Sequence, residues 1–178
     1  ALLKAATGQI ADKDELGGSE MHARITGLVE YLAEDDEHAI KITREVIDKI
    51  DWNYSLKIRE NILFDNPVYD ANELIGVVSA DYKIPYDVRE VVARLVDGSD
   101  FIDFKPLYGV STVCIQTKIY GHPCGIIGNN GPIDPSGATK AAQFIQLCDQ
   151  SNIPLIFLSN TTGFMVGKQS EQLGMIKH

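Results

Sequence analysis

The 178-residue sequence has no long hydrophobic run and no surplus of positive charge. No apolar stretch approaches the roughly 20 residues that a helix needs to span a bilayer, so we expect no membrane span. The formal net charge is −9, which excludes nucleic acid as an expected partner, because binding to phosphates requires concentrated Lys and Arg. With 44% hydrophobic and 23% charged residues, the composition is that of a globular protein.

Cysteine and histidine are scarce, and neither has the spacing of a metal site. The four histidines form no HxxxH or HExxH pair. The cysteines are odd in number and show no metal-ligand spacing, so we expect free thiols in a reducing compartment: Cys114, Cys124 and Cys148. We therefore predict no metal site.

The common catalytic motifs are missing as well. There is no GxSxG elbow, no Walker-type phosphate loop and no GxGxxG, and Gly128 to Gly131 holds too few glycines for a dinucleotide fingerprint. The sequence begins without an initiator Met, and its first residues lack the apolar core of a signal peptide. We expect an internal piece of a longer polypeptide.

Residues 36–51 have the three- and four-residue apolar spacing of an amphipathic helix. The acidic cluster at 34–37 complements the amino terminus of this helix, and we favour that role over an acidic metal site. The apolar side comprises Ala39, Ile40, Thr43, Val46, Ile47 and Ile50. After residue 51 the apolar residues show no regular spacing, so we expect a connection between two structural units at 52–74.

Residues 87–97 are the second predicted helix. Asp87 and Glu90 have the spacing of a capping box, and Gly98 follows as the terminating residue. The expected buried stripe is Val88, Val91, Val92, Leu95 and Val96. Arg89 and Arg94 lie off this stripe, where we expect solvent or ion pairs rather than phosphate contacts.

The carboxyl-terminal half predicts a ββαβ unit. Strands at 112–120 and 124–128 flank a turn at 121–123, and a second turn at 129–132 leads into a helix at 134–151. The expected packing side of that helix is Ala138, Ala141, Ala142, Ile145 and Cys148. Residues 153–159 then form a short continuous apolar run, which predicts a strand buried on both faces.

Two strand ends carry glycine, at 128–131 and at 161–167. Backbone amides exposed before a helix favour developing negative charge, so such ends suit stabilisation of an enolate without a nucleophilic side chain. Two plain structural turns are the alternative that the spacing leaves open.

The motifs then point to a family. TTGFMVG (161–167), after AAQFIQLCDQSNIP (141–154) and an apolar strand, closely resembles the carboxyltransferase (β) subunit of biotin-dependent acyl-CoA carboxylases. Further matching segments, in order along nearly the whole chain, are ELGGSEMHARITG (15–27), AEDDEHAIKITREVI (33–47), DVREVVARLVDGSDF (87–101) and GIIGNNGPI (125–133). GFMVG, in place of the GFLPG of acetyl- and propionyl-CoA enzymes, is similar to the methylcrotonyl-CoA and geranyl-CoA branch.

The resemblance implies an α/β, crotonase-like fold with two domains per subunit, each built from ββα units. It implies transfer of a carboxyl group from carboxybiotin, carried on a partner subunit or domain, to the enolate of an acyl-CoA substrate. The implied partners are a biotin carboxylase/biotin carrier (α) subunit and further β subunits in a homo-oligomer. The implied compartment is the bacterial cytoplasm or, in a eukaryote, the mitochondrial matrix.

The resemblance also divides the chain and places the site. Residues 1–51 match the end of the amino-terminal domain, 52–74 the connection, and 75–178 the first part of the carboxyl-terminal domain. The main-chain carbonyl of Phe164 matches the position that contacts the biotin ureido group. The other implied biotin-pocket residues are Gly163, Met165 and Gly167, with Asn129, Asn130 and Gly131 at the adjacent strand end.

The oxyanion loops of the family are expected outside these residues, so no residue here is assigned a catalytic role and the isolated chain is expected to be inactive. Three alternatives stay open: an acetyl- or propionyl-CoA carboxylase β subunit, a biotin-dependent decarboxylase subunit, and a non-catalytic assembly module.

Overall fold

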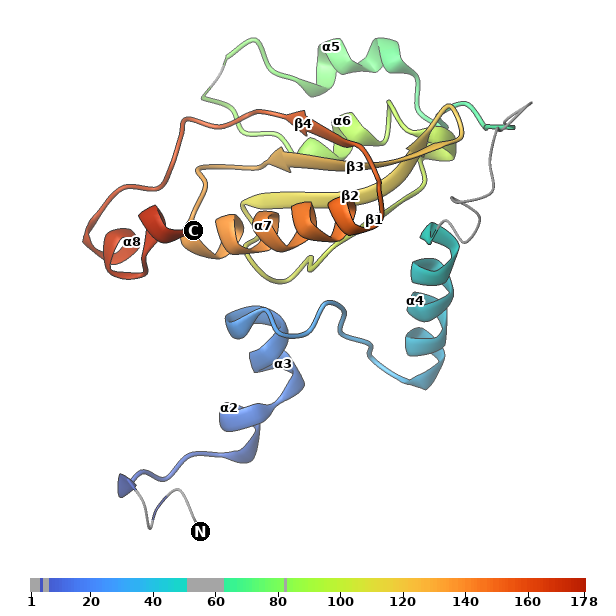
Figure 1. Cartoon of the computed structure of the whole chain (residues 1–178). Coiled ribbons are helices and arrows are strands. Elements are labelled where there is room, and N and C mark those ends of the chain that lie inside the picture. The colour runs from blue at the N-terminus through green and yellow to red at the C-terminus, as the bar shows by residue number, and fades with distance from the viewer. Residues whose placement is uncertain (1–3, 5–6, 51–62, 82) are drawn as a thin grey trace.

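The computed structural model describes residues 4, 7–50, 63–81 and 83–178 (Figure 1). The expected connection at 52–74 therefore lies partly outside the described residues. The amino-terminal part holds α2 (Lys13–Gly17), α3 (Ser19–Met21), a π-helical turn (His22–Thr26) and α4 (Asp36–Lys49). After residue 62 come a 3₁₀ turn (Ala71–Glu73), α5 (Leu74–Val77), α6 (Val88–Val92) and a second 3₁₀ turn (Asp97–Ser99).

The remaining elements form the predicted ββαβ unit with one additional strand. They are β1 (Phe101–Asp103), β2 (Thr112–Ile119), β3 (His122–Asn129), α7 (Pro135–Gln150), β4 (Leu155–Leu158), α8 (Lys168–Gln172) and a 3₁₀ turn (Met175–Lys177). The sheet order is β1-β2-β3-β4. β1 and β3 pair with β2 in antiparallel fashion, whereas β4 runs parallel to β3. Among the described residues, no helix is long and apolar enough to cross a membrane.

The hairpin between β2 and β3 is tighter than predicted. Ile119 lies opposite His122, so the turn is Tyr120-Gly121 and not residues 121–123. Both turn residues have positive φ, 51° and 74°, as a two-residue turn between twisted strands requires. His122 and Pro123 are consequently the first residues of β3.

The core lies on both faces of the two central strands. On one face, Val88 and Val92 of α6 and Val96 beyond its end pack against β2 and β3 residues Val113, Ile115, Cys124 and Ile126. On the other face, α7 packs Phe144 and Cys148 against Phe104, Cys114 and Ile127. The alternation of Cys114 and Ile115 between the two clusters follows from the two-residue period of a strand. In Figure 1, α7 crosses the sheet in front and α6 lies behind it.

The second predicted helix begins where expected but ends early. The Asp87 side chain caps it by accepting from the Arg89 N–H at 3.0 Å, whereas the Glu90 side chain pairs with Arg94 instead of closing a capping box. After Val92 the chain tightens into i→i+3 bonds, which rotate Leu95 outward, 38% exposed, although Val96 stays buried. The prediction that Leu95 is buried is therefore wrong. Gly98, at φ 59°, ends the segment as predicted.

The packing side of α7 was predicted correctly only in part: Cys148 is buried and Ala141 packs against the core, as predicted. Ala142 and Ile145 are exposed, and the buried residues of the helix are Pro135, Gly137, Lys140, Phe144 and Cys148. The reason is close contact at the amino-terminal end, where a Cβ on Gly137 would collide with Thr112 Oγ1. This contact sets the rotation of the helix, and Phe144 then fills the core.

The prediction that the last strand is buried on both faces is also wrong. β4 is an edge strand of the sheet that the described residues form, and Ile156 and Phe157 are 37% and 59% exposed. Its apolar sequence is typical of a central strand, but among the described residues only β3 pairs with it.

The first predicted helix, α4, spans Asp36–Lys49 and has the expected acidic amino terminus. Asp35 caps it by accepting from the His38 N–H at 2.8 Å. Its apolar side is largely open, with Ile40 63% and Ile47 47% exposed. An ion pair from Lys49 to Asp100 connects the end of α4 to the residue before β1.

Candidate functional site

The two glycine-bearing strand ends lie side by side. β3 and β4 are parallel neighbours, so their carboxyl ends meet at one edge of the sheet. Beyond the strands, Ile133 and Phe164 form a parallel bridge. The Ile133 N–H donates to the Gly163 carbonyl at 3.0 Å, and the Met165 N–H donates to the Ile133 carbonyl at 2.8 Å. The two segments that the sequence singled out separately therefore form one structure.

Phe164 occupies the outward position of this bridge. Because amide groups alternate in direction along an extended segment, the Phe164 N–H and C=O point away from Ile133. Its side chain is 65% exposed, and Met165 and Val166 beside it are 40% and 83% exposed. The segment thus presents backbone polar groups next to an apolar surface.

Thr161 connects the two strand ends. Its hydroxyl oxygen accepts from the Gly163 N–H at 3.1 Å. Its single hydroxyl hydrogen has two carbonyl acceptors within reach, Gly131 at 3.2 Å and Gly163 at 3.1 Å. The hydroxyl therefore stabilises the loop after β4 against the turn after β3.

Gly163 and Gly167 bound the exposed segment. Their φ angles are +123° and +126°, which side chains rarely adopt, whereas a Cβ at either position would meet no atom within 4 Å. Backbone conformation, and not crowding, is what requires glycine here.

Asn129, Asn130 and Gly131 lie at the end of β3, but the side chain of Asn130 turns toward α6. Its Oδ1 accepts from the Val88 N–H at 2.8 Å, and its Nδ2 donates to Asp87 Oδ1 at 2.9 Å. Asn129 is 7% exposed, opposite Thr112 in the β-ladder. These contacts hold the strand end in place.

Ion pairs continue from Asp87 into the sheet. The Arg89 guanidinium lies 3.1 Å from Asp87 and, through Nη2, 2.5 Å from Asp103 Oδ2. Burial raises the pKa of Asp103 although Arg89 opposes that shift. Burial also raises the pKa of Asp87, but hydrogen bonds from the Arg89 backbone and from Asn130, together with the charge of Arg89, outweigh it and leave that pKa below its ordinary value. Arg89 and Arg94 are both in ion pairs, as predicted.

Lys140 is a buried ionisable residue that was not predicted from the sequence. It is fully buried in α7, and its Nζ donates to the carbonyls of Tyr108 at 2.8 Å and Lys105 at 3.2 Å. Burial lowers its pKa. Both acceptors belong to the loop between β1 and β2, so its contacts fix that loop against the helix. Lys140 stands one helical turn before Phe144, and this spacing places both residues on the same buried face of α7; that was the available signal of its burial.

The three cysteines are buried and free, as expected. Burial raises the pKa of Cys114 to about 12 and the pKa values of Cys124 and Cys148 to about 11. Thiols with these pKa values are poor nucleophiles. The described residues contain no cluster of His, Cys, Asp and Glu able to hold a metal ion.

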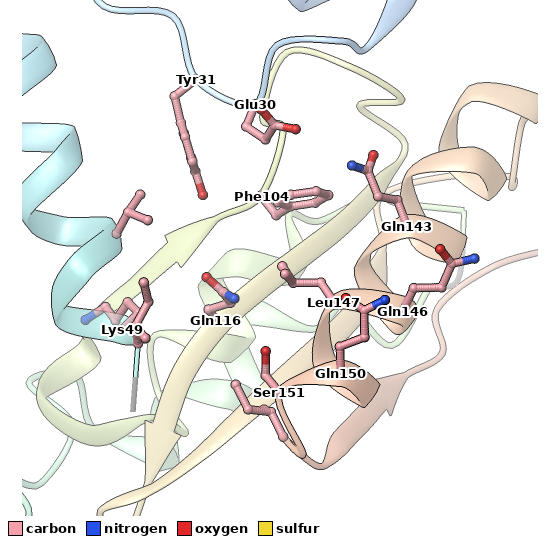
Figure 2. Close-up of a pocket in the computed structure, with 13 residues that line it drawn as sticks. Glu30, Tyr31, Lys49, Phe104, Gln116, Gln143, Gln146, Leu147, Gln150 and Ser151 are labelled. Carbon is pink, nitrogen blue, oxygen red and sulfur yellow. The ribbon is translucent and has the colours of Figure 1, made fainter. Parts of the chain in front are cut away.

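A cavity of about 700 Å³ lies near the carboxyl-terminal end of α7, away from the strand ends (Figure 2). Tyr31 reaches into it from the amino-terminal part, and α7 contributes Gln143, Gln146 and Gln150 (Figure 2). Burial raises the pKa of Tyr31 to about 12, and the Asp103 and Glu30 carboxylates act in the same direction. The other lining residues are Glu30, Val46, Lys49, Ile50, Phe104, Gln116, Leu147, Ser151 and Ile153.

Known proteins match this chain over nearly its whole length. The family model described as the carboxyl transferase domain matches residues 1–178. The biotin-dependent 3-methylcrotonyl-coenzyme A carboxylase beta1 subunit of Mycobacterium tuberculosis is 44% identical over 183 residues, covering 99% of this chain and 33% of that protein.

Two solved structures are similar. The geranyl-CoA carboxylase beta subunit of P. aeruginosa is 56% identical, with a TM-score of 0.65 over 97% of this chain and 33% of that one. Transcarboxylase 12S, described as a hexamer, is 36% identical, with a TM-score of 0.86 over 98% of this chain and 35% of that one.

The chain spans about a third of the length of these relatives. Its four-stranded sheet between helices is part of the crotonase-like fold of the solved members. By family match and by fold, the chain belongs to the carboxyl transferase domain family.

Proposed function

We propose that this chain is part of a carboxyltransferase (β) subunit of a biotin-dependent acyl-CoA carboxylase. The observation that carries the proposal is the bridge between Ile133 and Phe164, which joins the two strand ends in a chain that matches the family over its full length. The residues proposed from the motifs for the biotin pocket come from the two segments joined by this bridge: Gly163, Phe164, Met165, Gly167, Asn129, Asn130 and Gly131.

The edge fits a small cyclic urea with an apolar chain. The outward backbone groups of Phe164 supply a hydrogen-bond partner for a ureido group, and the exposed Phe164, Met165 and Val166 supply an apolar wall. When bound, carboxybiotin supplies the carboxyl group, and the enolate of the acyl-CoA receives it. The part of this chain in the reaction is to bind and orient, because residues 161–167 include no titratable side chain.

For the substrate, we propose a β-branched unsaturated acyl-CoA, geranyl-CoA or 3-methylcrotonyl-CoA. GFMVG at 163–167 supports this choice over the GFLPG of acetyl- and propionyl-CoA enzymes. The names of the two carboxylase relatives, one for geranyl-CoA and one for 3-methylcrotonyl-CoA, support it as well.

We further propose that residues 1–51 end one domain, 52–74 connect, and 75–178 begin a second. The partners would be a biotin carboxylase/biotin carrier (α) subunit and further β subunits, in the cytoplasm of a bacterium or the mitochondrial matrix of a eukaryote. The hexamer described for transcarboxylase 12S supports the homo-oligomer.

The test is a carboxylation assay on the complete natural subunit with its α partner, using geranyl-, 3-methylcrotonyl- and propionyl-CoA. We expect turnover with a β-branched unsaturated substrate, and preference for propionyl-CoA would overturn the substrate proposal. Decarboxylation alone would indicate a decarboxylase subunit. Stable oligomers that bind neither biotin nor acyl-CoA would indicate an assembly module. The isolated 178-residue chain should show no turnover.

A further inference from the structure

The Asn130 side chain links the turn after β3 to the start of α6. This side chain is joined on both polar atoms to α6, although 42 and 43 residues separate Asn130 from its partners Val88 and Asp87. Its own N–H donates to the Ser111 carbonyl at 2.8 Å. We propose that Asn130 is a positioning residue, which sets the position of the Phe164 segment by holding the turn after β3 against α6.

The side-chain contacts of Asn130 require an amide. One atom must accept from the Val88 N–H, and the other must donate to the Asp87 carboxylate. A carboxylate at position 130 keeps the acceptor but loses the donor and faces Asp87 with a like charge. An apolar residue loses both bonds and leaves the Val88 N–H without its partner.

The anchor on α6 is packed into the core. Val88 and Val92 are 2% and 0% exposed within the core. Asp87 is held by Arg89, which also pairs with Asp103 in β1. β3 approaches α6 so closely that a Cβ on Gly128 would lie 2.7 Å from Val88 Cγ2. The position of Asn130 is therefore set by the core and not by the loop.

From Asn130 the contacts pass directly to the site. The next residue, Gly131, offers its carbonyl to the Thr161 hydroxyl at 3.2 Å. Two residues further, Ile133 exchanges backbone hydrogen bonds with Gly163 and Met165 on either side of Phe164. A displaced turn after β3 thus moves both partners of the Phe164 segment. The catalytic consequence rests on the proposed function, whereas the mechanical coupling does not.

The experiment is hydrogen exchange of residues 159–167 in the complete subunit, because exchange reads the coupling without any assay of activity. Asn130→Ala should raise the exchange of these amides about tenfold, in line with the loss of two hydrogen bonds at their anchor. The matched control is Asn72→Ala, which removes an exposed bond of the same type, Nδ2 to Asp70 Oδ1 at 3.0 Å, and should leave the exchange of 159–167 unchanged.

A second variant separates positioning from loss of folding. Asn130→Asp keeps the acceptor for the Val88 N–H but loses the donor to Asp87, so it should fold and still raise the exchange of residues 159–167. If Asn130→Ala fails to fold, Asn130→Asp decides. Unchanged exchange of residues 159–167 in Asn130→Asp would overturn the proposal.

Steady-state kinetics of the same variants test whether the position of the Phe164 segment affects catalysis. The kcat/KM for the biotin-bearing partner should fall by as much as about 10²-fold in Asn130→Ala and stay unchanged in Asn72→Ala, with the KM for acyl-CoA unchanged in both. An equal rise in the KM for acyl-CoA would contradict a role confined to the biotin side. If neither the wild-type subunit nor any variant carboxylates an acyl-CoA, the proposed function fails. The hydrogen-exchange data still test whether Asn130 positions the Phe164 segment.

Discussion

Among the described residues, the buried ionisable groups are thiols in apolar clusters or side chains held by ion pairs and hydrogen bonds. The three thiols lie in apolar clusters on the two faces of the sheet, where burial keeps them protonated. Asp103 is compensated on one oxygen by Arg89, while its Oδ1 has no hydrogen-bond partner among the described residues. Lys140 donates to two carbonyls. None of these groups adjoins Phe164, so we assign them to stability rather than to chemistry.

Cys114 gives a pH prediction at this scale. The thiol of an unfolded chain titrates at about pH 8.5, whereas the pKa of Cys114 in the fold is about 12. Between these values the folded state keeps a proton that the unfolded state releases, so the free energy of unfolding falls as pH rises, by about 1.4 kcal/mol per pH unit for one thiol. Cys114→Val should make this decline shallower in urea unfolding of the complete subunit, and identical slopes would contradict the assignment.

At the scale of elements, the seating of α7 on the sheet depends on one small residue. Gly137 lies in the first turn, where the Asp134 side chain caps the helix by accepting from the Gly137 N–H at 2.6 Å. The same residue faces Thr112 in β2. The beginning of α7 and the end of β3 are joined by a short turn, so the seating of the helix also affects the strand-end site.

Gly137→Ala should therefore destabilise the protein in spite of the higher helix propensity of Ala. Its Cβ would collide with Thr112 Oγ1 and lie 2.9 Å from Asp134 Oδ1, and overpacking of this kind costs about 1–3 kcal/mol. Gly76→Ala in α5 is the control, because a Cβ there would meet nothing within 4 Å and should stabilise by at most about 1 kcal/mol. Denaturant unfolding of both variants measures the difference, and similar stability changes would refute the close-packing argument.

At the scale of the whole molecule, a few contacts join the amino-terminal part to the sheet. The Lys105 side chain, 4% exposed, donates to the Gly27 carbonyl and lies 3.5 Å from Glu30 Oε1. Gly27 packs so tightly on the Tyr108 ring that a Cβ would lie 2.6 Å from Cδ1. The cavity of Figure 2 lies between these parts, so its shape depends on the same contacts.

Lys105→Met should loosen this junction. The methionine fills similar volume but offers neither the hydrogen bond to Gly27 nor the charge opposite Glu30, so we expect faster limited proteolysis within residues 28–35 of the complete subunit. Lys118→Met, on an exposed position of β2, serves as the control and should leave the cleavage rate unchanged. Cleavage at the same rate in both variants would show that Lys105 does not hold the junction.

Local signals in the sequence predicted the local structure well. The acidic cap of α4, the start of α6 at Asp87 and the order hairpin, helix, strand all depend on neighbouring residues and were confirmed. Two errors were local: the hairpin turn is Tyr120-Gly121, and Glu90 closes no capping box. The other errors concern faces: Leu95 and Ile145 are exposed because tight turns and a close helix–sheet contact rotate them outward. The exposure of Phe157 likewise depends on which strands pair with β4, and the local sequence does not indicate that pairing.

The sequence by itself determined the family, the ββαβ order and the two glycine-bearing strand ends, because ordered motifs and turn residues are properties of short segments. Only the tertiary structure decided that these ends are one site, through a bridge between residues far apart in the chain, Ile133 and Phe164. It also decided that the Asn130 side chain faces α6 and that Lys140 lies fully buried in the helix that packs on the sheet. Such facts depend on long-range packing, since the partner of a polar group is fixed only when the elements that carry both come together.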